Sequence, residues 1–281
     1  MKVSKIKSYA KINLALNING KKNFLHSIES IISFIDLHDV ITINENKSDK
    51  HQISFNGKFS KNISKKNTVE KLFQILDDKN LLKGKKFKVR IKKNIPQEAG
   101  LGGGSMNAAN LLNYLINKKI IKLSTKNIKI ICSLIGSDVI LGIDFSSCIL
   151  SSNNKIKKFY GCPKYFPLLV MPNFGCSTKK VYSGVRKFTK SEFSQPKKYM
   201  FYSKYLINQK NALEQITLKK YPKLKKIKSF LEGTNNPIFV RMTGSGSTMI
   251  AYYNSLKNCK LAKAEFRRKY KNYWCITSKT I

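Results

Sequence analysis

Residues 96–106 of the chain read P-Q-E-A-G-L-G-G-G-S-M, with glycines at positions 100, 102, 103 and 104. Such a run is poorly suited to the interior of a strand or helix, because glycine loses more backbone entropy on ordering than any other residue. A loop of bare backbone N–H groups can instead approach an anion closely. The stretch therefore predicts an anion-binding loop, with a flexible linker or a tight turn as the alternative interpretations.

The segments on both sides of this loop indicate that the anion is a phosphate. Residues 87–91 alternate apolar and basic side chains, with the period of two that is typical of a half-buried strand. After the loop, Ser105 is a favourable N-cap residue, and apolar residues recur at helical spacing over 111–116. A strand, a glycine loop and a helix N-terminus in succession form an arrangement that binds phosphate.

Two common phosphate loops are excluded by the spacing. A G-x-x-x-x-G-K-[ST] loop needs a lysine after its last glycine, and Ser105 follows Gly104 here. A G-x-G-x-x-G loop that begins at Gly100 needs a third glycine where the chain has Ser105. The loop therefore belongs to another class.

The composition predicts a globular protein with a sizeable core. The chain has 281 residues, of which 42% are hydrophobic, enough for one large domain or two moderate ones. Its 6 cysteines include no C-x-x-C pair, and with only 3 histidines they favour free thiols in a reducing compartment and no metal site. The sequence contains neither a membrane-spanning apolar run nor a signal-peptide core, so we expect a cytoplasmic protein.

The net charge of +39 has two interpretations. A strongly basic surface attracts nucleic acids, which makes RNA binding one hypothesis. However, the 54 basic residues are almost all lysines, they are dispersed along the whole chain, and no nucleic-acid-binding motif accompanies them. A coding bias toward lysine is therefore the favoured explanation, and an anionic substrate would benefit from the charge in either case.

The order of predicted elements indicates an α+β fold in two domains, residues 1–152 and 153–281. In the first domain we expect a strand over 11–18, a turn at Asn19-Gly20, His26 in a loop, and strands over 28–37 and 40–43. A hairpin and loop over 47–66 precede a helix that Asn67 or Thr68 caps, and Ser124 caps a helix that ends at Gly136. In the second domain we expect a loop over 174–182, helices around 202–217 and 223–231, and a glycine-rich turn over 243–247.

Few residues in this framework carry chemistry. Asp138 follows the predicted end of a helix and is surrounded by apolar residues, which suits a general base or, more simply, a turn residue. Lys11 and Asn13 lie on the same face of the first strand. Taken separately, these residues, His26 and the turn at 244–246 have simple structural explanations.

Taken in order, four motifs resemble the GHMP small-molecule kinases along essentially the whole chain. They are Ser8-Tyr-Ala-Lys-Ile-Asn-Leu14, the glycine loop, Gly136-Ser-Asp138 and Arg241-Met-Thr-Gly-Ser-Gly246. The resemblance implies a ribosomal-protein-like N-terminal α/β domain and a ferredoxin-like C-terminal α+β domain. The A-K-I-N-L, F-I-D-L-H-D and G-L-G-G-G-S segments resemble the branch that phosphorylates a small alcohol carrying a diphosphocytidyl group. Homoserine and mevalonate kinases typically have G-L-G-S-S-A instead.

This resemblance implies an enzyme that uses ATP and Mg²⁺. Asp138 would accept the proton of the substrate hydroxyl, and Lys11 would keep Asp138 ionised and orient that hydroxyl. The glycine loop would bind the ATP phosphates through Pro96, Gln97, Glu98, Ala99, Gly100, Leu101, Gly102, Gly103, Gly104, Ser105 and Met106.

The resemblance also implies roles around the two substrates. Asn13 and His26 would lie near the alcohol substrate, with His26 reading the cytosine, and Asn67 and Lys93 would lie by the adenine. The diphosphate end would be lined by Thr178, Gly244, Ser245 and Gly246. Leu25 and Met106 depart from the family pattern, which has a tyrosine and a serine at these positions.

Two alternative functions remain at this stage. One is another GHMP kinase, of the homoserine or mevalonate type. The other is a non-enzymatic RNA-binding protein, which the charge and the related fold of a small-subunit ribosomal protein suggest. For the kinase we expect a small-molecule substrate, no specific nucleic-acid partner, no membrane contact, and a monomer or homodimer.

Overall fold

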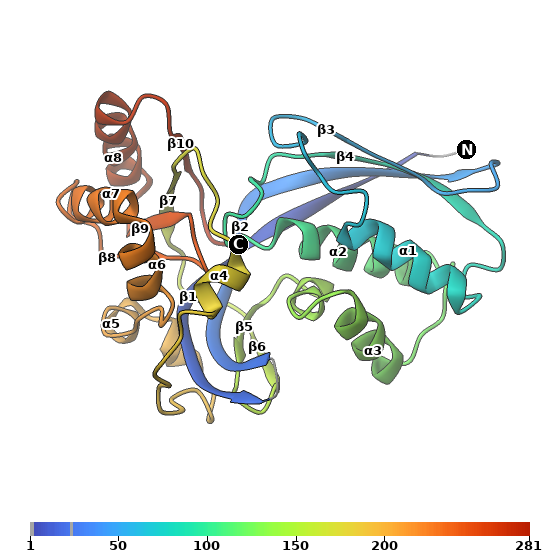
Figure 1. Ribbon diagram of the computed structural model, residues 1–281, viewed down its shortest axis with the longest axis horizontal. Helices are drawn as coiled ribbons and strands as arrows, with labels where there is room; N and C mark the ends of the chain where they lie inside the picture. The colour runs from blue at the N-terminus through green and yellow to red at the C-terminus, as the bar shows by residue number, and fades with distance from the viewer. Residues whose placement is uncertain (1–2, 23–24) are drawn as a thin grey trace. The chain divides into compact units, whose positions relative to one another are not determined.

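The computed structural model describes residues 3–22 and 25–281. The chain forms two compact units. Unit 1 comprises Met1–Ala10, Leu37–Gln97 and Gly102–Phe145, and unit 2 comprises Lys11–Asp36, Glu98–Leu101 and Ser146–Ile281. Two long strands, β1 (Ser4–Lys22) and β2 (Leu25–Asn46), each contribute to both units (Figure 1). This division differs from a single boundary at residue 152, so the two expected domains stay a prediction.

Unit 1 is built on strand β4 (Lys86–Lys92), whose alternating sequence was the basis for predicting a strand. Phe87, Val89 and Ile91 are buried, as the period of two predicts. β4 pairs antiparallel with the second half of β2 and parallel with β3 (Gln52–Asn56). The prediction of a hairpin over 47–66 is therefore wrong, because β3, the strand in this segment, pairs with β4, which comes later in the chain.

In unit 1, the helices α1 (Thr68–Asp78) and α2 (Gly103–Asn117) cover one face of this sheet, and α3 (Thr125–Ile135) packs against α1 and α2 (Figure 1). Asn67 is the N-cap of α1, and its side chain accepts hydrogen bonds from the backbone N–H groups of Val69 and Glu70. Ser124 caps α3 in the same way. Both caps confirm the predicted helix starts, because capping depends only on residues within one turn.

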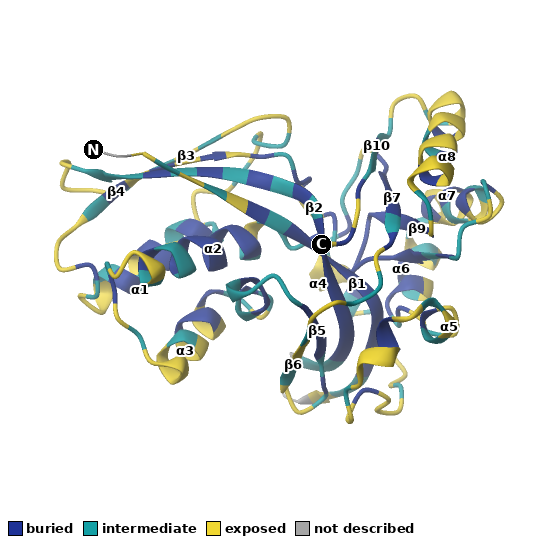
Figure 2. Ribbon diagram, turned by 180° about the vertical axis from the view of Figure 1, so that it is seen from behind, coloured by how far each residue is buried: buried dark blue, intermediate teal, exposed yellow. Residues whose placement is uncertain are grey.

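The main sheet of unit 2 has four antiparallel strands in the order β10-β7-β9-β8. These are β7 (Phe166–Met171), β8 (Phe239–Met242), β9 (Met249–Tyr253) and β10 (Trp274–Thr277). Helices α7 (Pro222–Glu232) and α8 (Leu256–Lys269) pack on it and bury one side each, while their outer sides are exposed (Figure 2). In the same unit, β5 (Ser147–Leu150) pairs with the first half of β2 and with β6 (Ile156–Phe159).

Several expectations for the strands and loops are wrong. β1, which pairs with β2, continues past Asn19-Gly20 to Lys22, and the Asn19 side chain donates hydrogen bonds to the carbonyls of Thr189 and Lys190, distant in sequence. His26 lies in β2 and not in a loop, and the strands expected over 28–37 and 40–43 are parts of this one strand. The loop expected over 174–182 contains a short helix, α4 (Thr178–Tyr182).

The helix expected over 202–217 is interrupted. It consists of α5 (Ser203–Leu206) and α6 (Glu214–Lys220), preceded by the 3-10 helix η2 (Lys198–Phe201). Between α5 and α6 the chain forms a bridge with β1, in which Leu16 N donates to Lys210 O (3.0 Å) and Ala212 N donates to Leu16 O (2.8 Å). Within the described residues, every helix is too short or too polar to cross a membrane.

Candidate functional site

The second part of the glycine loop forms the N-terminus of α2. The helix begins at Gly103, earlier than the Ser105 cap predicted from the sequence, and its N-cap is Gly102 with a left-handed φ of 69°. Only glycine adopts this conformation without strain, and a glycine cap has no side chain to bond the first turn. Met106 N already donates to Gly102 O (2.9 Å), so the N–H groups of residues 103–105 point out of the helix, at the positive end of its dipole.

The consecutive glycines of the loop let neighbouring elements approach α2 closely. A Cβ atom built on Gly103 would lie 3.0 Å from Ile95 Cγ2 and 3.2 Å from Lys93 Nζ. One built on Gly104 would lie 3.2 Å from Thr68 Oγ1, which donates a hydrogen bond to Gly104 O (2.7 Å). A Cβ atom at either position would therefore be tight, and these neighbouring side chains would have to shift by a few tenths of an ångström to admit it.

Asp138 lies at the start of the 3-10 helix η1 (Val139–Ile143), which packs against α2 in unit 1. The contact is close at Gly142, where a built Cβ would lie 2.8 Å from both Met106 Sδ and Ala109 Cβ. The Met106 side chain is fully buried in this contact. Asp138 is half-buried, and the segment that carries it is held directly on the helix that follows the glycine loop.

The first part of the glycine loop belongs to unit 2 and packs against the second glycine-rich turn. Gly100 has a φ of 73°, and a Cβ built on it would lie 2.1 Å from Thr243 O. Thr243 Oγ1 donates to Gly100 O (3.2 Å), and a Cβ on Gly244 would lie 3.1 Å from Gly100 Cα. The two glycine stretches therefore meet backbone against backbone, and this contact is one physical reason for their composition.

The other loop residues are held by protein contacts. Pro96, Ala99 and Leu101 are buried. Gln97 Nε2 donates to the carbonyls of Phe59 (3.0 Å) and Lys61 (2.7 Å). Glu98 O accepts hydrogen bonds from Cys176 N (3.4 Å) and Ser247 N (3.3 Å).

Lys11 and Asn13 lie side by side in β1, as their strand spacing predicts. Both are buried, and Lys11 Nζ donates to Asn13 Oδ1 (2.7 Å). The Asn13 amide is itself oriented, since Nδ2 donates to Ser30 Oγ (2.8 Å) and the backbone N donates to Thr243 Oγ1 (3.0 Å). The lysine that was the candidate cation is therefore a buried and positioned group.

The predicted residues at the diphosphate end also lie together in unit 2. The hydroxyl groups of Thr178 and Ser245 are hydrogen-bonded at 3.0 Å. Gly244 O accepts from Asn211 Nδ2 (2.8 Å), and Gly246 N donates to Thr243 O (3.0 Å), which holds the turn.

His26 contacts an aromatic residue that the sequence did not suggest. Its ring lies 5.1 Å from the Tyr182 ring, at an interplanar angle of 44°. Partial burial and then the nearby charge of Lys21 lower the pKa of His26, so the imidazole is neutral at pH 7. Tyr182 lies at the end of α4, and no sequence pattern relates it to β2.

Asn67 and Lys93, expected by the adenine, have structural partners in unit 1. Besides capping α1, Asn67 donates through Nδ2 to Ser64 O (3.0 Å). It also lines a cavity of about 1020 Å³, together with Lys65, Lys66 and Thr68. Lys93 is buried in an ion pair with Asp39.

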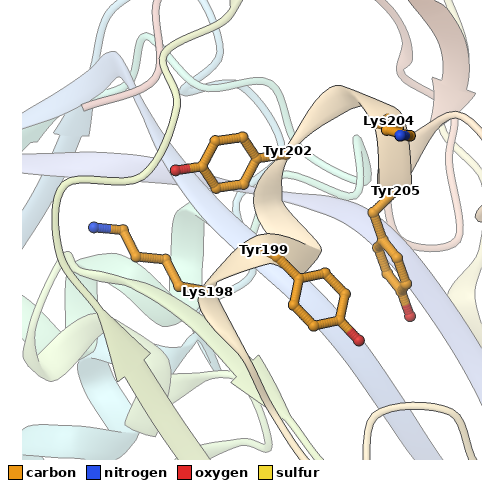
Figure 3. A pocket seen from close by; sticks show the side chains of 5 residues that line it. All are labelled: Lys198, Tyr199, Tyr202, Lys204 and Tyr205. Carbon is orange, nitrogen blue, oxygen red and sulfur yellow. The ribbon is translucent and has the colours of Figure 1, made fainter.

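A second cavity, of about 660 Å³, lies in unit 2 and contains none of the predicted site residues. It is lined by Lys198, Tyr199, Tyr202, Lys204 and Tyr205 (Figure 3). Tyr199 and Tyr205 contact each other edge to face, with centroids 5.5 Å apart. Among the described residues, the His, Cys, Asp and Glu side chains form no cluster of three or more that could hold a metal ion.

Each unit thus gathers one part of the predicted site. Unit 1 carries Asn67, Lys93, Pro96, Gln97, the start of α2 and Asp138. The other predicted site residues belong to unit 2.

Residues 66–152 match the GHMP kinases N terminal domain, which defines the class of protein. The chain is similar in fold to the crystal structure of a 4-(cytidine 5'-diphospho)-2C-methyl-D-erythritol kinase, with a TM-score of 0.77 and 19% identity over 98% of this chain and 99% of that one. It also resembles a homoserine kinase from Cytophaga hutchinsonii, with a TM-score of 0.72 and 13% identity over 100% and 95% of the two chains.

Sequence similarity is more specific than this likeness of fold. The chain is 58% identical to the 4-diphosphocytidyl-2-C-methyl-D-erythritol kinase of Pelagibacter ubique (strain HTCC1062) over 99% of both chains. It is 33% identical to the enzyme of the same name from Clostridium perfringens, over 99% of this chain and 98% of that one. The chain therefore belongs to the family of 4-diphosphocytidyl-2-C-methyl-D-erythritol kinases. This confirms the α+β GHMP kinase fold and an ATP-dependent small-molecule kinase over the RNA-binding alternative.

Proposed function

We propose that the chain transfers the γ-phosphoryl group of ATP to the 2-hydroxyl group of 4-diphosphocytidyl-2-C-methyl-D-erythritol. The observation that carries this proposal is the 58% identity, over 99% of both chains, with a relative of that name. The start of α2 supports it, because free N–H groups at the positive end of a helix suit a polyphosphate. The net charge of +39 favours the approach of two anionic substrates.

ATP binds, in this proposal, with its phosphates on the N–H groups of residues 103–105. The cavity beside Asn67 and Thr68 is in the same unit, and the Thr68 hydroxyl is bonded to Gly104, so a nucleotide on α2 is close to this cavity. Mg²⁺ would neutralise phosphate charge when bound, and the Asp138 carboxylate together with phosphate oxygens is a donor set of the kind it prefers.

Asp138 acts as the general base that accepts the proton of the substrate hydroxyl. Its placement on η1, packed against α2, supports this role, since it lies on the same packed body as the phosphate-binding helix end. Lys11 supplies the positive charge that stabilises the reacting oxygens, and Asn13 holds its ammonium group. Phosphoryl transfer depends mainly on positioning and charge stabilisation, so these groups suffice for the protein's part.

The diphosphocytidyl group binds to unit 2. A neutral His26 has one N–H donor and one acceptor nitrogen, which complements the amino group and ring nitrogen of cytosine. Tyr182 supplies an aromatic face next to His26 for stacking on the base, in place of the tyrosine that the family has at position 25. The hydroxyls of Thr178 and Ser245 are donors for the diphosphate.

A panel of acceptors tests the substrate. Purified protein is incubated with ATP, Mg²⁺ and either 4-diphosphocytidyl-2-C-methyl-D-erythritol, homoserine or mevalonate, and ADP release is measured. We expect turnover with the first acceptor and at least about 100-fold lower kcat/KM with the others, because they lack the group that unit 2 recognises. Efficient turnover of homoserine or mevalonate would contradict the proposal.

The general base is tested with Asp138→Asn. We expect kcat to fall by about 10²- to 10⁴-fold, the usual contribution of a general base. Asp144→Asn is the matched control, because Asp144 lies at the other end of the same 3-10 helix. A kcat for Asp138→Asn within a few-fold of this control would remove Asp138 from the mechanism.

A further inference from the structure

Asp39 in β2 is a fully buried carboxylate that the roles above leave unexplained. One of its oxygens accepts hydrogen bonds from Asn94 N (2.7 Å) and Ile95 N (2.9 Å), in the segment between β4 and the glycine loop. The other accepts from Asn107 Nδ2 (2.9 Å) in α2 and from Lys93 Nζ. A single carboxylate therefore joins β2, the end of β4 and the start of α2.

Lys93, the ion-pair partner of Asp39, has an unusual position. Its side chain is only 5% exposed, and a Cβ atom built on Gly103 would lie 3.2 Å from Lys93 Nζ. The ammonium group is therefore at the first residue of α2, where the positive end of the helix dipole disfavours a cation. Gly103 leaves the space that this ammonium occupies.

The burial of this ion pair is by itself weak evidence for a role in stability. A buried ion pair loses the hydration of both charges, and replacing such a pair by apolar residues is often neutral or stabilising. An anion bound at the same end of α2 would offset both the dipole repulsion and the lost hydration of the lysine. The residues present thus suit a ligand with phosphate charge.

We propose that Asp39 is a positioning residue for nucleotide binding. Its carboxylate holds the Lys93 ammonium group beside the anion that α2 binds, and through Asn107, just after the first turn, it fixes the N-terminal part of α2 against the end of β4. Asp39 itself does not touch the nucleotide. The inference rests on the proposed function, because it takes the anion to be ATP.

The test measures the dissociation constants of ATP and of the diphosphocytidyl acceptor by calorimetric titration of the full chain, with thermal unfolding in parallel. For Asp39→Asn and for Lys93→Met we expect ATP to bind about 10- to 100-fold more weakly, the effect of losing a positioned charge-assisted hydrogen bond. The affinity for the acceptor should stay within about 2-fold, because neither residue belongs to unit 2.

Asp36→Asn is the matched control. Asp36 lies on the same strand but in unit 2, where its carboxylate accepts hydrogen bonds from Ser278 Oγ and from Lys279 N (3.1 Å). This variant also loses carboxylate hydrogen bonds and so some thermal stability, but we expect its ATP affinity to stay within about 2-fold of wild type. Equal ATP affinities for Asp39→Asn and Asp36→Asn would overturn the inference.

A double variant separates positioning from a purely structural role. Asp39→Asn/Lys93→Met removes both charges together, so it should recover part of the thermal stability lost by Asp39→Asn. ATP affinity should stay low, because the cation is absent; recovered affinity would overturn the inference. Parallel losses of ATP and acceptor binding in Asp39→Asn would do the same.

Two further results are decisive. If Asp39→Asn does not fold, the Lys93→Met variant decides, because Asp39 keeps its hydrogen bonds from Asn94, Ile95 and Asn107 in that variant. An unchanged ATP affinity of Lys93→Met then overturns the inference. If wild-type protein binds no ATP, the proposed function fails and this inference with it. Wild-type binding with unaffected variants overturns the inference alone.

Discussion

The contact between the two glycine-rich stretches predicts a large effect of Gly100→Ala. The added Cβ atom would lie 2.1 Å from Thr243 O and 2.9 Å from Thr243 C, distances that real Cβ atoms do not show. Both neighbouring atoms belong to the backbone of a turn, so relief requires that turn or the loop to move by about 1 Å. Alanine would also have to keep the left-handed φ of 73°.

The expected loss of stability combines three contributions. The left-handed conformation costs a non-glycine residue about 1–2 kcal/mol. Overpacking against a rigid backbone costs about 1–3 kcal/mol more. Alanine reduces the entropy of the unfolded chain, which returns about 0.4–1 kcal/mol. We therefore expect the free energy of unfolding to fall by about 3 kcal/mol, within a range of about 1–5 kcal/mol.

Urea-induced unfolding followed by circular dichroism measures this loss. Gly20→Ala is the control, because Gly20 is also in unit 2 and a Cβ atom built on it has no neighbour within 4 Å. We expect the control to keep the free energy of unfolding or raise it by up to about 1 kcal/mol, because it gains the unfolded-chain entropy effect without a clash. If Gly100→Ala were as stable as Gly20→Ala, the backbone contact between Gly100 and Thr243 would not exist in solution.

Two further predictions concern aromatic and titratable groups. Tyr182→Ala should raise the KM for the diphosphocytidyl acceptor by about 5- to 100-fold, because one stacking face next to His26 is lost. The KM for ATP should stay unchanged. An equal rise of both KM values in steady-state kinetics would contradict this prediction. Burial lowers the pKa of His51 below 6.5 in the folded protein, although Asp77 opposes this shift. The neutral imidazole of His51 therefore contributes to stability above pH 6.5, and this contribution is lost as the pH falls through the pKa of the folded state. His51→Asn, which can still accept from Phe87 N, should therefore weaken the fall in unfolding free energy between pH 7.5 and 5; an unchanged pH dependence in urea titrations would refute this.

The sequence was informative wherever a feature depends on neighbours within a few positions. The alternation over 87–91 predicted β4, and Asn67 and Ser124 predicted the starts of two helices, because a strand face or a helix cap is decided within one turn or a few residues. The order of four short motifs was enough to identify the class of kinase. The glycines at 102–104 predicted a loop that leads into a helix, although the helix begins earlier than Ser105 suggested.

The wrong expectations have a common physical cause. β1 continues past Asn19 in its pairing with β2, and the Asn19 side chain bonds carbonyl groups 170 and 171 residues later. The helix after residue 202 is interrupted where the chain pairs with Leu16. Local propensity is weak compared with such contacts, and a pattern read from neighbouring residues contains no information about them.

What the sequence by itself determined is the family and the glycine-rich start of a helix. Only the tertiary structure decided which residues are partners. Thr243 donates a hydrogen bond to Gly100, 143 positions earlier, and the Tyr182 ring contacts His26. Asp39 accepts hydrogen bonds from side chains 54 and 68 residues away. These pairings arise when distant strands and helices are packed together, because burial and hydrogen bonding of a polar group depend on whatever the fold places beside it.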